Sequence, residues 1–396
     1  MEVKTKQKQK SLMIISRSFP PFVVGSSILM SNLFDSYEGE AKALACWQYQ
    51  TKIDSGFTTP CETFYLKMPN AFLQRVFDRF QHKLMFINRL FIRKHLKKHR
   101  PDLVFFVYPN APFLVAAYQV CRSMRIPYVL QMHDLWEENY SIEHPRGALA
   151  RKWEAQIYKN ALRRFSMTKI QQAHYKNKYN LPIDILPHTI RPERIESGLA
   201  DWKHRQKLGQ SSKNYTVVYT GNISSAMNLD AIRQLVLAVD LLPPEVKVKM
   251  FVNFNEEQCR NLGVYHELIE YDWLPISKVQ EEMREADVLF LPLSFKNAAM
   301  DEVKTVYATK TLDYLVSGTP ILVFSPSDSF HSISAKEKGW GFVVTKDSPK
   351  ALADGINRLR NETDLGDSLV SAAFEEAESR NAIKYAGQIN QLVNTI

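Results

Sequence analysis

The sequence predicts an α/β protein with two Rossmann-like domains that face each other across a cleft. Three observations support this fold class. The chain has 396 residues, enough for two domains. Short apolar strands alternate with helical stretches along most of it. Its residues are 45% hydrophobic and 23% charged, a globular composition. The four cysteines show no metal-ligand spacing, so we expect free thiols in a reducing cytoplasm.

The first half begins with a lysine-rich lead-in over residues 1–10, which we expect to be disordered. A first strand should follow, then a proline-containing loop and a capped helix, and later a strand, a helix and a further strand. The expected bounds are Leu12–Ser16 for the first strand, about Ser26–Phe34 for the helix, Asp102–Tyr108 for the next strand, Pro112–Cys121 for the second helix and Tyr128–Met132 for the last strand.

A long amphipathic stretch over residues 70–100 has apolar side chains at helical spacing. Its other positions hold nine basic residues and a single acid, Asp78. We expect either a membrane-surface helix or a helix that packs on the core and exposes its basic face. The apolar side chains are Leu73, Phe77, Phe80, Leu84, Ile87 and Phe91.

Residues 191–213 are polar and lack apolar periodicity, so we interpret them as the domain junction. We therefore place the first domain at 1–190, the second at 191–378, and a C-terminal helix at 379–396 that packs back on the first domain. The second domain should alternate strand and helix, and the chain should be helical from Lys350 onward. Its expected elements are strands Thr216–Thr220, Lys247–Val252, Val288–Leu293 and Ile321–Phe324, with helices Leu229–Ala238 and Ser277–Arg284.

The net charge of +9 is unevenly distributed. Residues 1–190 hold 28 basic and 14 acidic residues and carry +14, whereas the remainder carries −5. A cationic first half suits an anionic membrane surface or a pyrophosphate-bearing substrate. It also suits nucleic acid, although we recognise no nucleic-acid-binding motif and expect no such partner. No run reaches the roughly 18 apolar residues of a spanning helix, so we expect a cytoplasmic protein, peripheral on the inner face of the membrane.

The most informative stretch runs from Ala286 to Val323 and reads as a strand, a polar loop, a short helix and a second strand. Thr309 and Lys310 stand where the helix should begin, and a helix N-terminus favours phosphate. Asp313 lies one turn later, where a carboxylate can accept ribose hydroxyls. This pattern predicts a nucleotide-diphosphate pocket that lacks a Walker loop. An ordinary buried unit without a ligand is the alternative.

These residues resemble the donor-sugar motif of retaining glycosyltransferases of the GT-B fold, family 4. The motif places a small residue before Lys, then an acid and Tyr, then Gly-x-Pro. This chain has Thr309-Lys310, Asp313-Tyr314 and Gly318-Thr319-Pro320 in that order. Relatives with two Glu residues seven positions apart would place the first at Thr305, which offers no carboxylate. The resemblance is best over Val217–Val344 and moderate over Leu12–Glu138. Residues 40–100 resemble nothing that we can place.

Two further segments of the first half follow predicted strands. Gly25 with Ser26 resembles the family's first glycine loop, near the donor phosphates and the acceptor, although a turn glycine is an equally good interpretation. His133 and Asp134 end a central strand, and the resemblance places such a His beside the transferred sugar. A histidine there can bond sugar hydroxyls or move a proton.

In the second half, Gly221 and Asn222 end a strand where many relatives have Gly-Arg and a later Lys. Neither cation is present, so backbone N–H groups around residues 221–225 would have to bind the diphosphate. The resemblance places the segment of Trp273 at the pocket for the base, where the ring would stack, but we expect Trp273 to pack in the core. The chain contains no Asp-x-Asp, so we expect no metal and no cofactor, with Lys310 stabilising the leaving group.

The resemblance implies a retaining, hexosyltransferase-type enzyme that moves a sugar from a nucleotide-diphosphate donor to a glycan or polyprenyl-linked acceptor. His133 and Lys310 are the expected catalytic residues. Donor-binding residues would be Gly25, Gly221, Asn222, Thr309, Lys310 and Asp313, with Ser26 and Asp134 on the acceptor side. The alternatives are a GT-B sugar-nucleotide epimerase, a non-catalytic GT-B-like partner subunit and a basic nucleic-acid-binding protein. The sequence does not identify the sugar, the nucleotide or the linkage.

Overall fold

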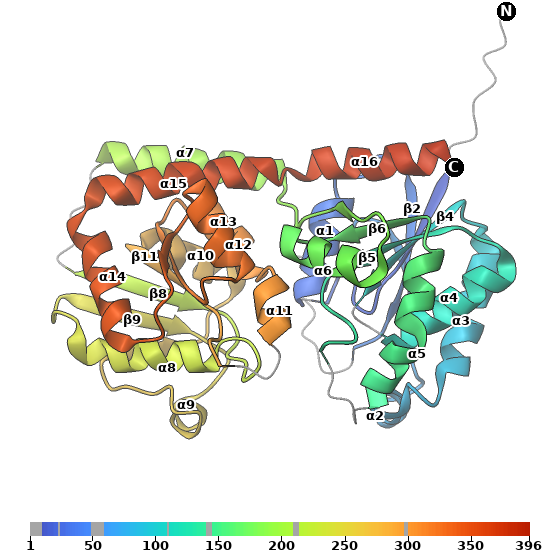
Figure 1. Ribbon diagram of the computed structural model, residues 1–396, viewed down its shortest axis with the longest axis horizontal. Helices are drawn as coiled ribbons and strands as arrows, with labels where there is room; N and C mark the ends of the chain where they lie inside the picture. The colour runs from blue at the N-terminus through green and yellow to red at the C-terminus, as the bar shows by residue number, and fades with distance from the viewer. Residues whose placement is uncertain are drawn as a thin grey trace, which may run out of the picture. The chain divides into compact units, whose positions relative to one another are not determined.

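The computed structural model describes residues 10–22, 24–48, 59–108, 111–139, 145–208, 214–296 and 300–396. The chain divides into two compact units. Unit 1 extends to Arg191 and includes the C-terminal segment Ala382–Ile396, while unit 2 comprises Pro192–Asn381 (Figure 1). Most of the lysine-rich lead-in lies outside the described residues, so the prediction for it stays a prediction.

Unit 1 is built on a seven-stranded parallel sheet with the order β3-β2-β1-β4-β5-β6-β7. Every residue of β4 and β5 is buried, as expected for parallel strands covered on both faces. The strands are β1 Ser11–Ile15, β2 Glu40–Cys46, β3 Glu62–Leu66, β4 Leu103–Tyr108, β5 Tyr128–Met132, β6 Arg163–Ser166 and β7 Asp184–Ile185.

The helices of unit 1 cover this sheet and share one hydrophobic core with it. The last helix of the chain, α16, belongs to this unit and packs beside α1 (Figure 1). The helices are α1 Gly25–Phe34, α2 Ala71–Phe80, α3 Met85–His99, α4 Ala111–Met124, α5 Pro145–Asn160, α6 Lys169–Tyr179 and α16 Ala382–Thr395.

Unit 2 has a six-stranded parallel sheet with the order β10-β9-β8-β11-β12-β13 and a core of its own. Its strands are β8 Tyr215–Thr220, β9 Val246–Phe251, β10 Ile269–Asp272, β11 Val288–Pro292, β12 Ile321–Phe324 and β13 Phe342–Val344. Its helices are α7 Pro192–Leu208, α8 Leu229–Ala238, the 3₁₀ turn Val239–Leu241, α9 Glu256–Asn261, α10 Ile276–Glu285, α11 Met300–Thr305, α12 Lys310–Leu315, α13 Phe330–Lys338, α14 Pro349–Asn361 and α15 Thr363–Ser379.

The strand order reverses direction once in each sheet, and this position determines where a ligand site is expected. In unit 1 the chain continues from β1 to β2 on one side and to β4 on the other. In unit 2 the equivalent reversal separates β8 from β11. Open parallel sheets bind ligands beyond the carboxyl ends of strands at such a point. The predicted fold class, two Rossmann-like domains with parallel sheets, is confirmed.

The amphipathic stretch forms two helices rather than one. α2 ends at Phe80 and α3 begins at Met85. In the turn between them, the buried side chain of Gln81 donates a hydrogen bond to the thiol of Cys46 on β2. The turn allows each helix to direct its own apolar side chains toward the unit 1 core. The apolar stripe predicted for one long helix is therefore divided between two helices that meet at a turn after Phe80.

Two other segments differ from the sequence expectations. The predicted domain junction, residues 191–213, for which we expected no helix, is mostly α7, which starts with Pro192 and Glu193, two residues favourable in a first helical turn. Its buried side contains only Ile195 and Gly198, so the apolar periodicity was too weak to detect. Residues 209–213 lie outside the described residues. In residues 40–100, which resembled nothing that we could place, β2 and β3 extend the sheet beyond β1.

Candidate active site

The centre of the candidate site is the end of β8, at the strand-order reversal of unit 2. Gly221 follows this strand with φ of +106°, a conformation that favours glycine. A Cβ at this position would lie 3.2 Å from Nζ of Lys310, a residue 89 positions later in the chain. Because glycine has no Cβ, the backbone at Gly221 can lie close to the Lys310 amine, which the sequence predicted as the cation for the leaving group.

Lys310 is the first residue of α12, and its amine is buried although the residue as a whole is partly exposed. Nζ lies 3.9 Å from the centre of the Tyr219 ring and makes no hydrogen bond within the described part of the chain. Burial lowers the pKa of the Lys310 side chain from its usual value to about 7. The site thus contains an amine whose positive charge is not compensated by a protein carboxylate among the described ion pairs.

Two buried side chains hold the segment that carries Lys310. The Tyr314 hydroxyl accepts a hydrogen bond from the Thr220 backbone N–H at 3.1 Å, which connects α12 to the end of β8. On the other side, Nε2 of His331 accepts from the Ala308 N–H at 3.3 Å and lies 3.1 Å from the Thr311 hydroxyl. Burial lowers the pKa of His331 to about 3, so the ring is neutral and can accept.

The backbone N–H groups that we expected to bind phosphate are partly occupied. The Gly221 N–H donates to the Phe251 carbonyl, and the Ser224 N–H donates to the Asn228 side chain. The Asn222 carbonyl accepts from the Tyr219 hydroxyl at 2.7 Å, which closes the loop. Because these N–H groups already have partners, the expectation that residues 221–225 serve as a backbone cradle is weakened, and Lys310 becomes more important.

Thr309 precedes α12 in a helical conformation and makes no side-chain capping bond. The helix has only six residues, and the N–H groups of Thr311 and Leu312 already donate to the Ala308 and Thr309 carbonyls. The predicted helix start is therefore correct, but it offers fewer unpaired N–H groups than a longer helix would. Thr305 directs its hydroxyl to the Asp301 carbonyl within α11.

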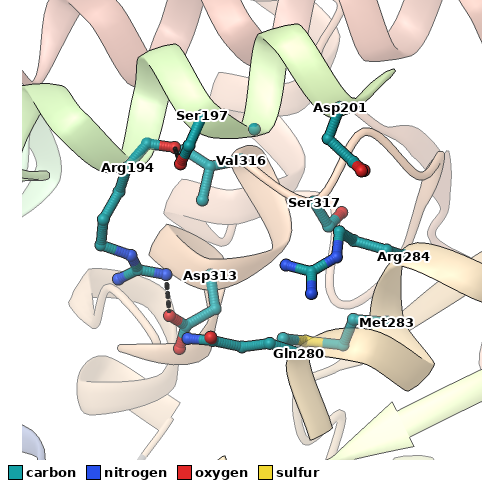
Figure 2. Close-up of a pocket in the computed structure, with 10 residues that line it drawn as sticks. Arg194, Ser197, Asp201, Gln280, Met283, Arg284, Asp313, Val316 and Ser317 are labelled. Atoms are coloured by element: carbon teal, nitrogen blue, oxygen red, sulfur yellow. Dashed lines mark hydrogen bonds and ion pairs between the residues drawn. The ribbon is translucent and has the colours of Figure 1, made fainter. Parts of the chain in front are cut away.

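Asp313 has a partner that the sequence did not indicate. Its Oδ1 accepts a hydrogen bond from Nη2 of Arg194 at 2.6 Å, and both side chains line a pocket of about 340 Å³ between α7, α10 and α12 (Figure 2). The Asp313 side chain is 36% exposed, so the second carboxylate oxygen can still accept a hydroxyl. The two residues are separated by 119 positions, which explains why sequence reasoning missed Arg194.

In unit 1, His133 follows β5 and is buried, with Nε2 lacking a hydrogen bond within the described residues. Burial lowers its pKa to about 4, so the ring is neutral at neutral pH. It contacts His188 edge-to-face at 5.7 Å between ring centres, a second buried histidine that we missed. Asp134 is partly exposed, and its backbone carbonyl accepts from the Tyr175 hydroxyl at 3.5 Å.

The loop after His133 is anchored by a partly buried cluster of charges, in which only Glu154 is fully buried. The Glu137 N–H donates to the carboxylate of Glu154 at 2.8 Å. The Lys178 ammonium lies 2.9 Å from Glu137, 2.7 Å from Glu138 and 2.7 Å from Glu154. These three carboxylates are close enough to hold a metal ion, but the ammonium already bridges them. Metal independence of the reaction stays a prediction.

Gly25 and Ser26 form the first turn of α1, where Gly25 is exposed and Ser26 is partly exposed. Their predicted roles stay predictions. The expectation for Trp273 is wrong, because its side chain is 52% exposed and stands at the end of β10 instead of packing in the core. Sequence reasoning named Tyr314 only as part of the motif, without its positioning role. It missed His331 altogether, because a lone histidine in a helix gave no signal.

Residues 64–194 match the family model described as Glycosyltransferase Family 4. No curated protein matches the chain. Among solved structures it is similar to sucrose-phosphate synthase from Thermosynechococcus elongatus, with 15% identity, 98% and 99% of the two chains covered and a TM-score of 0.72. It is also similar to HepE from Anabaena in complex with UDP, with 16% identity, coverage of 98% and 100% and a TM-score of 0.67.

A further match is the lipopolysaccharide outer core galactosyltransferase WaaB in its apo form, with 12% identity, coverage of 98% and 99% and a TM-score of 0.60. At these identities the structural similarity establishes the fold. The recognition of a GT-B glycosyltransferase is confirmed, and the match to the family-4 model covers residues 64–194, nearly all of them in unit 1. The family match also covers residues 64–100, part of the stretch that the sequence alone left unplaced.

Proposed function

We propose that this glycosyltransferase takes its sugar from a nucleotide-diphosphate donor bound in unit 2 and transfers it to a glycan or polyprenyl-linked acceptor. The observation that carries the proposal is the buried Lys310 amine beside Gly221. Desolvation makes an unpaired ammonium unfavourable, so a negatively charged group at this position would regain much of the lost stabilisation. The leaving diphosphate supplies such a charge, and the charge increases as the glycosidic bond breaks.

The other predicted residues take roles consistent with their surroundings. Asp313 accepts a ribose hydroxyl through the oxygen that Arg194 leaves unbonded. His133, neutral at working pH, accepts or donates a hydrogen bond to a sugar or acceptor hydroxyl. The resemblance implies retention of configuration, with the leaving phosphate accepting the acceptor proton. The protein then contributes mainly position and electrostatic stabilisation.

A donor panel tests this proposal. UDP-sugars come first, since a similar structure is titled as a complex with UDP, followed by GDP- and dTDP-sugars. We expect slow donor hydrolysis by the wild type, and Lys310→Ala should lower turnover by about 10²-fold or more with the fold intact. Residual activity within about threefold of wild type would contradict the role of Lys310. Binding without turnover for every donor and acceptor would favour the non-catalytic subunit instead.

We propose a membrane contact on a surface of unit 1 that shares only Leu73 and Phe80 with the predicted stripe. Phe77 is buried and Leu84, Ile87 and Phe91 pack on the core, so these residues serve the fold. Other apolar side chains of α2 and α3 are exposed and lie among exposed basic residues, and we call them the apolar face. Its members, with exposed fractions, are Phe72 (72%), Leu73 (42%), Phe80 (40%), Phe86 (49%) and Leu90 (66%).

This apolar face has the chemistry of a helix pair that lies on an anionic bilayer. No helix in the described part of the chain is long and apolar enough to cross one. Basic residues near an anionic surface contribute about 1 kcal/mol each, screened by salt. The neighbouring exposed basic side chains are Arg75, Arg79, Lys83, Arg89, Arg93, Lys94, Lys97, Lys98 and Arg100.

Vesicle sedimentation tests this surface. We expect binding to anionic vesicles at low salt that is lost at high salt or when Lys94, Lys97 and Lys98 are changed to Glu. Phe72→Ser with Leu90→Ser should weaken binding even at low salt, whereas Leu237→Ser, an exposed leucine of unit 2, should not. Equal binding to neutral and anionic vesicles would refute the electrostatic part, and absence of binding to both would indicate a soluble acceptor.

A further inference from the structure

The pocket that contains Asp313 has a second arginine whose charge is not matched by any carboxylate of the described residues. Arg284, on α10, directs its guanidinium into the space enclosed by the lining residues (Figure 2). This guanidinium makes no hydrogen bond or ion pair with the described residues, although the Arg284 carbonyl accepts a hydrogen bond from Arg205. The pocket is lined by Arg194, Ser197, Gly198, Asp201, Gln280, Met283, Arg284, Asp313, Val316 and Ser317.

The two acidic side chains that line the pocket already have partners of their own. Asp201 pairs with Arg205 at 3.0 Å, and Asp313 pairs with Arg194 at 2.6 Å. Once these pairs are formed, one positive charge remains, on Arg284. A guanidinium always carries its charge and presents several donors in a fixed plane, so it matches the oxygens of a phosphate or carboxylate.

The shape and lining of the pocket suit a small ligand. Its volume of about 340 Å³ lies at the lower end for small-molecule sites. The carboxamide of Gln280 lies among its lining residues and can bond polar parts of a ligand, whereas the hydroxyls of Ser197 and Ser317 already donate to the Arg194 and Tyr314 carbonyls. Gly198 contributes by packing α7 closely on α12, where a Cβ would lie 2.2 Å from the Val316 carbonyl oxygen.

We propose that this pocket binds a small phosphorylated or carboxylated molecule, separate from the sugar donor, between Arg284 and Arg194. The anion would share the Arg194 guanidinium with Asp313 and weaken its hold on that carboxylate. If Asp313 accepts ribose hydroxyls as proposed above, the freed oxygen binds ribose better. Anion and nucleotide then bind with positive coupling, and each raises the affinity of the other by the same factor.

Calorimetric titration with inorganic phosphate at constant ionic strength tests the site. We expect saturable binding to the wild type that is weakened about tenfold or more by Arg284→Met, since a charge-assisted pair is removed. Arg260→Met is the matched control because it also removes one guanidinium from unit 2, on α9, where Arg260 pairs with Glu256 and lines no part of the pocket. The control should bind phosphate as the wild type does.

Two further variants separate this site from the donor site. Asp313→Asn removes the competitor for Arg194, so phosphate should bind more tightly while UDP binds more weakly. Arg284→Met should leave UDP affinity measured without phosphate unchanged. Phosphate binding that survives Arg284→Met but disappears in Lys310→Met would overturn the proposal, as would mutual exclusion of phosphate and UDP. Failure of UDP to bind any variant would count only against the proposed donor function.

Discussion

The ionisation of Lys310 makes nucleotide affinity dependent on pH, and this dependence can be calculated. Burial lowers the pKa of Lys310 to about 7, whereas a bound diphosphate should hold the side chain protonated. The apparent dissociation constant then equals the intrinsic constant divided by the protonated fraction of the free protein. That fraction is about one half at pH 7 and about one thirtieth at pH 8.5.

We therefore expect UDP affinity to fall about fifteenfold between pH 7 and pH 8.5, or about 1.6 kcal/mol. The sign follows from the lowered pKa, because raising the pH removes the proton that the ligand requires. A terminal phosphate has a second pKa of about 6, so its charge changes little in this interval. Calorimetry in buffers of different ionisation enthalpy should also detect uptake of about half a proton per nucleotide at pH 7.

Substitutions at the same position provide the controls. Lys310→Arg keeps a permanent charge, so UDP binding should lose its dependence on pH. Lys310→Met should bind weakly at every pH. Wild-type affinity that stays within about twofold across pH 7 to 8.5 would refute the reasoning, since it would mean that no proton accompanies the nucleotide.

The same burial makes a prediction about stability. The unfolded chain binds the lysine proton up to a pH of about 10.4, whereas the folded protein releases it near pH 7. The unfolded state therefore binds more protons between these values, and stability increases as the pH rises through this window. At pH 7 the penalty is on the order of 4 kcal/mol, so Lys310→Met should raise the free energy of unfolding measured with urea.

The remaining predictions concern three other side chains. Asp313→Ala should weaken free UDP and the donor equally, because the contact is the same before and during reaction; unchanged calorimetric affinity would make it only a helix residue. His133→Ala should lower the rate and spare nucleotide affinity, and the reverse pattern would reassign the residue. The pKa of His331 is lowered to about 3, so below pH 6.5 the unfolded state binds more protons than the folded state. The free energy of unfolding should therefore fall on acidification. His331→Gln should reduce that slope by up to about 1.4 kcal/mol per pH unit in urea unfolding between pH 6.5 and 4.

The sequence was most informative where strands are fully apolar and turns are marked by glycine or proline. Tyr128–Met132, Leu229–Ala238 and Ile321–Phe324 have the bounds that were predicted. The start of α12 at Lys310 was also recognisable, since the spacing of Lys310, Asp313 and the Gly-Thr-Pro turn is local. These features depend on neighbours within a few residues, which a single sequence records directly.

The sequence was least informative where a partner comes from a distant part of the chain. Arg194 and Asp313 lie 119 residues apart, and Gly221 meets Lys310 across 89 residues. Helix α7 was missed because its buried residues are only Ile195 and Gly198, so a single buried apolar side chain gives no hydrophobic periodicity. On α2 and α3, four of the six predicted stripe positions face the core, whereas Leu73 and Phe80 are exposed together with Phe72, Phe86 and Leu90.

The state of Lys310 bears on whether the site is active or degenerate. The sequence showed that two cations common after the equivalent of Gly221 are missing, which kept a non-catalytic subunit among the alternatives. The structure adds that Lys310 is buried without a hydrogen bond within the described residues, a state that destabilises the folded protein. A subunit that binds no anion would gain stability by replacing this lysine with an apolar residue. The protein retains a desolvated amine near the carboxyl end of β8 at a cost in folding stability. Binding of an anionic substrate explains why this cost is accepted.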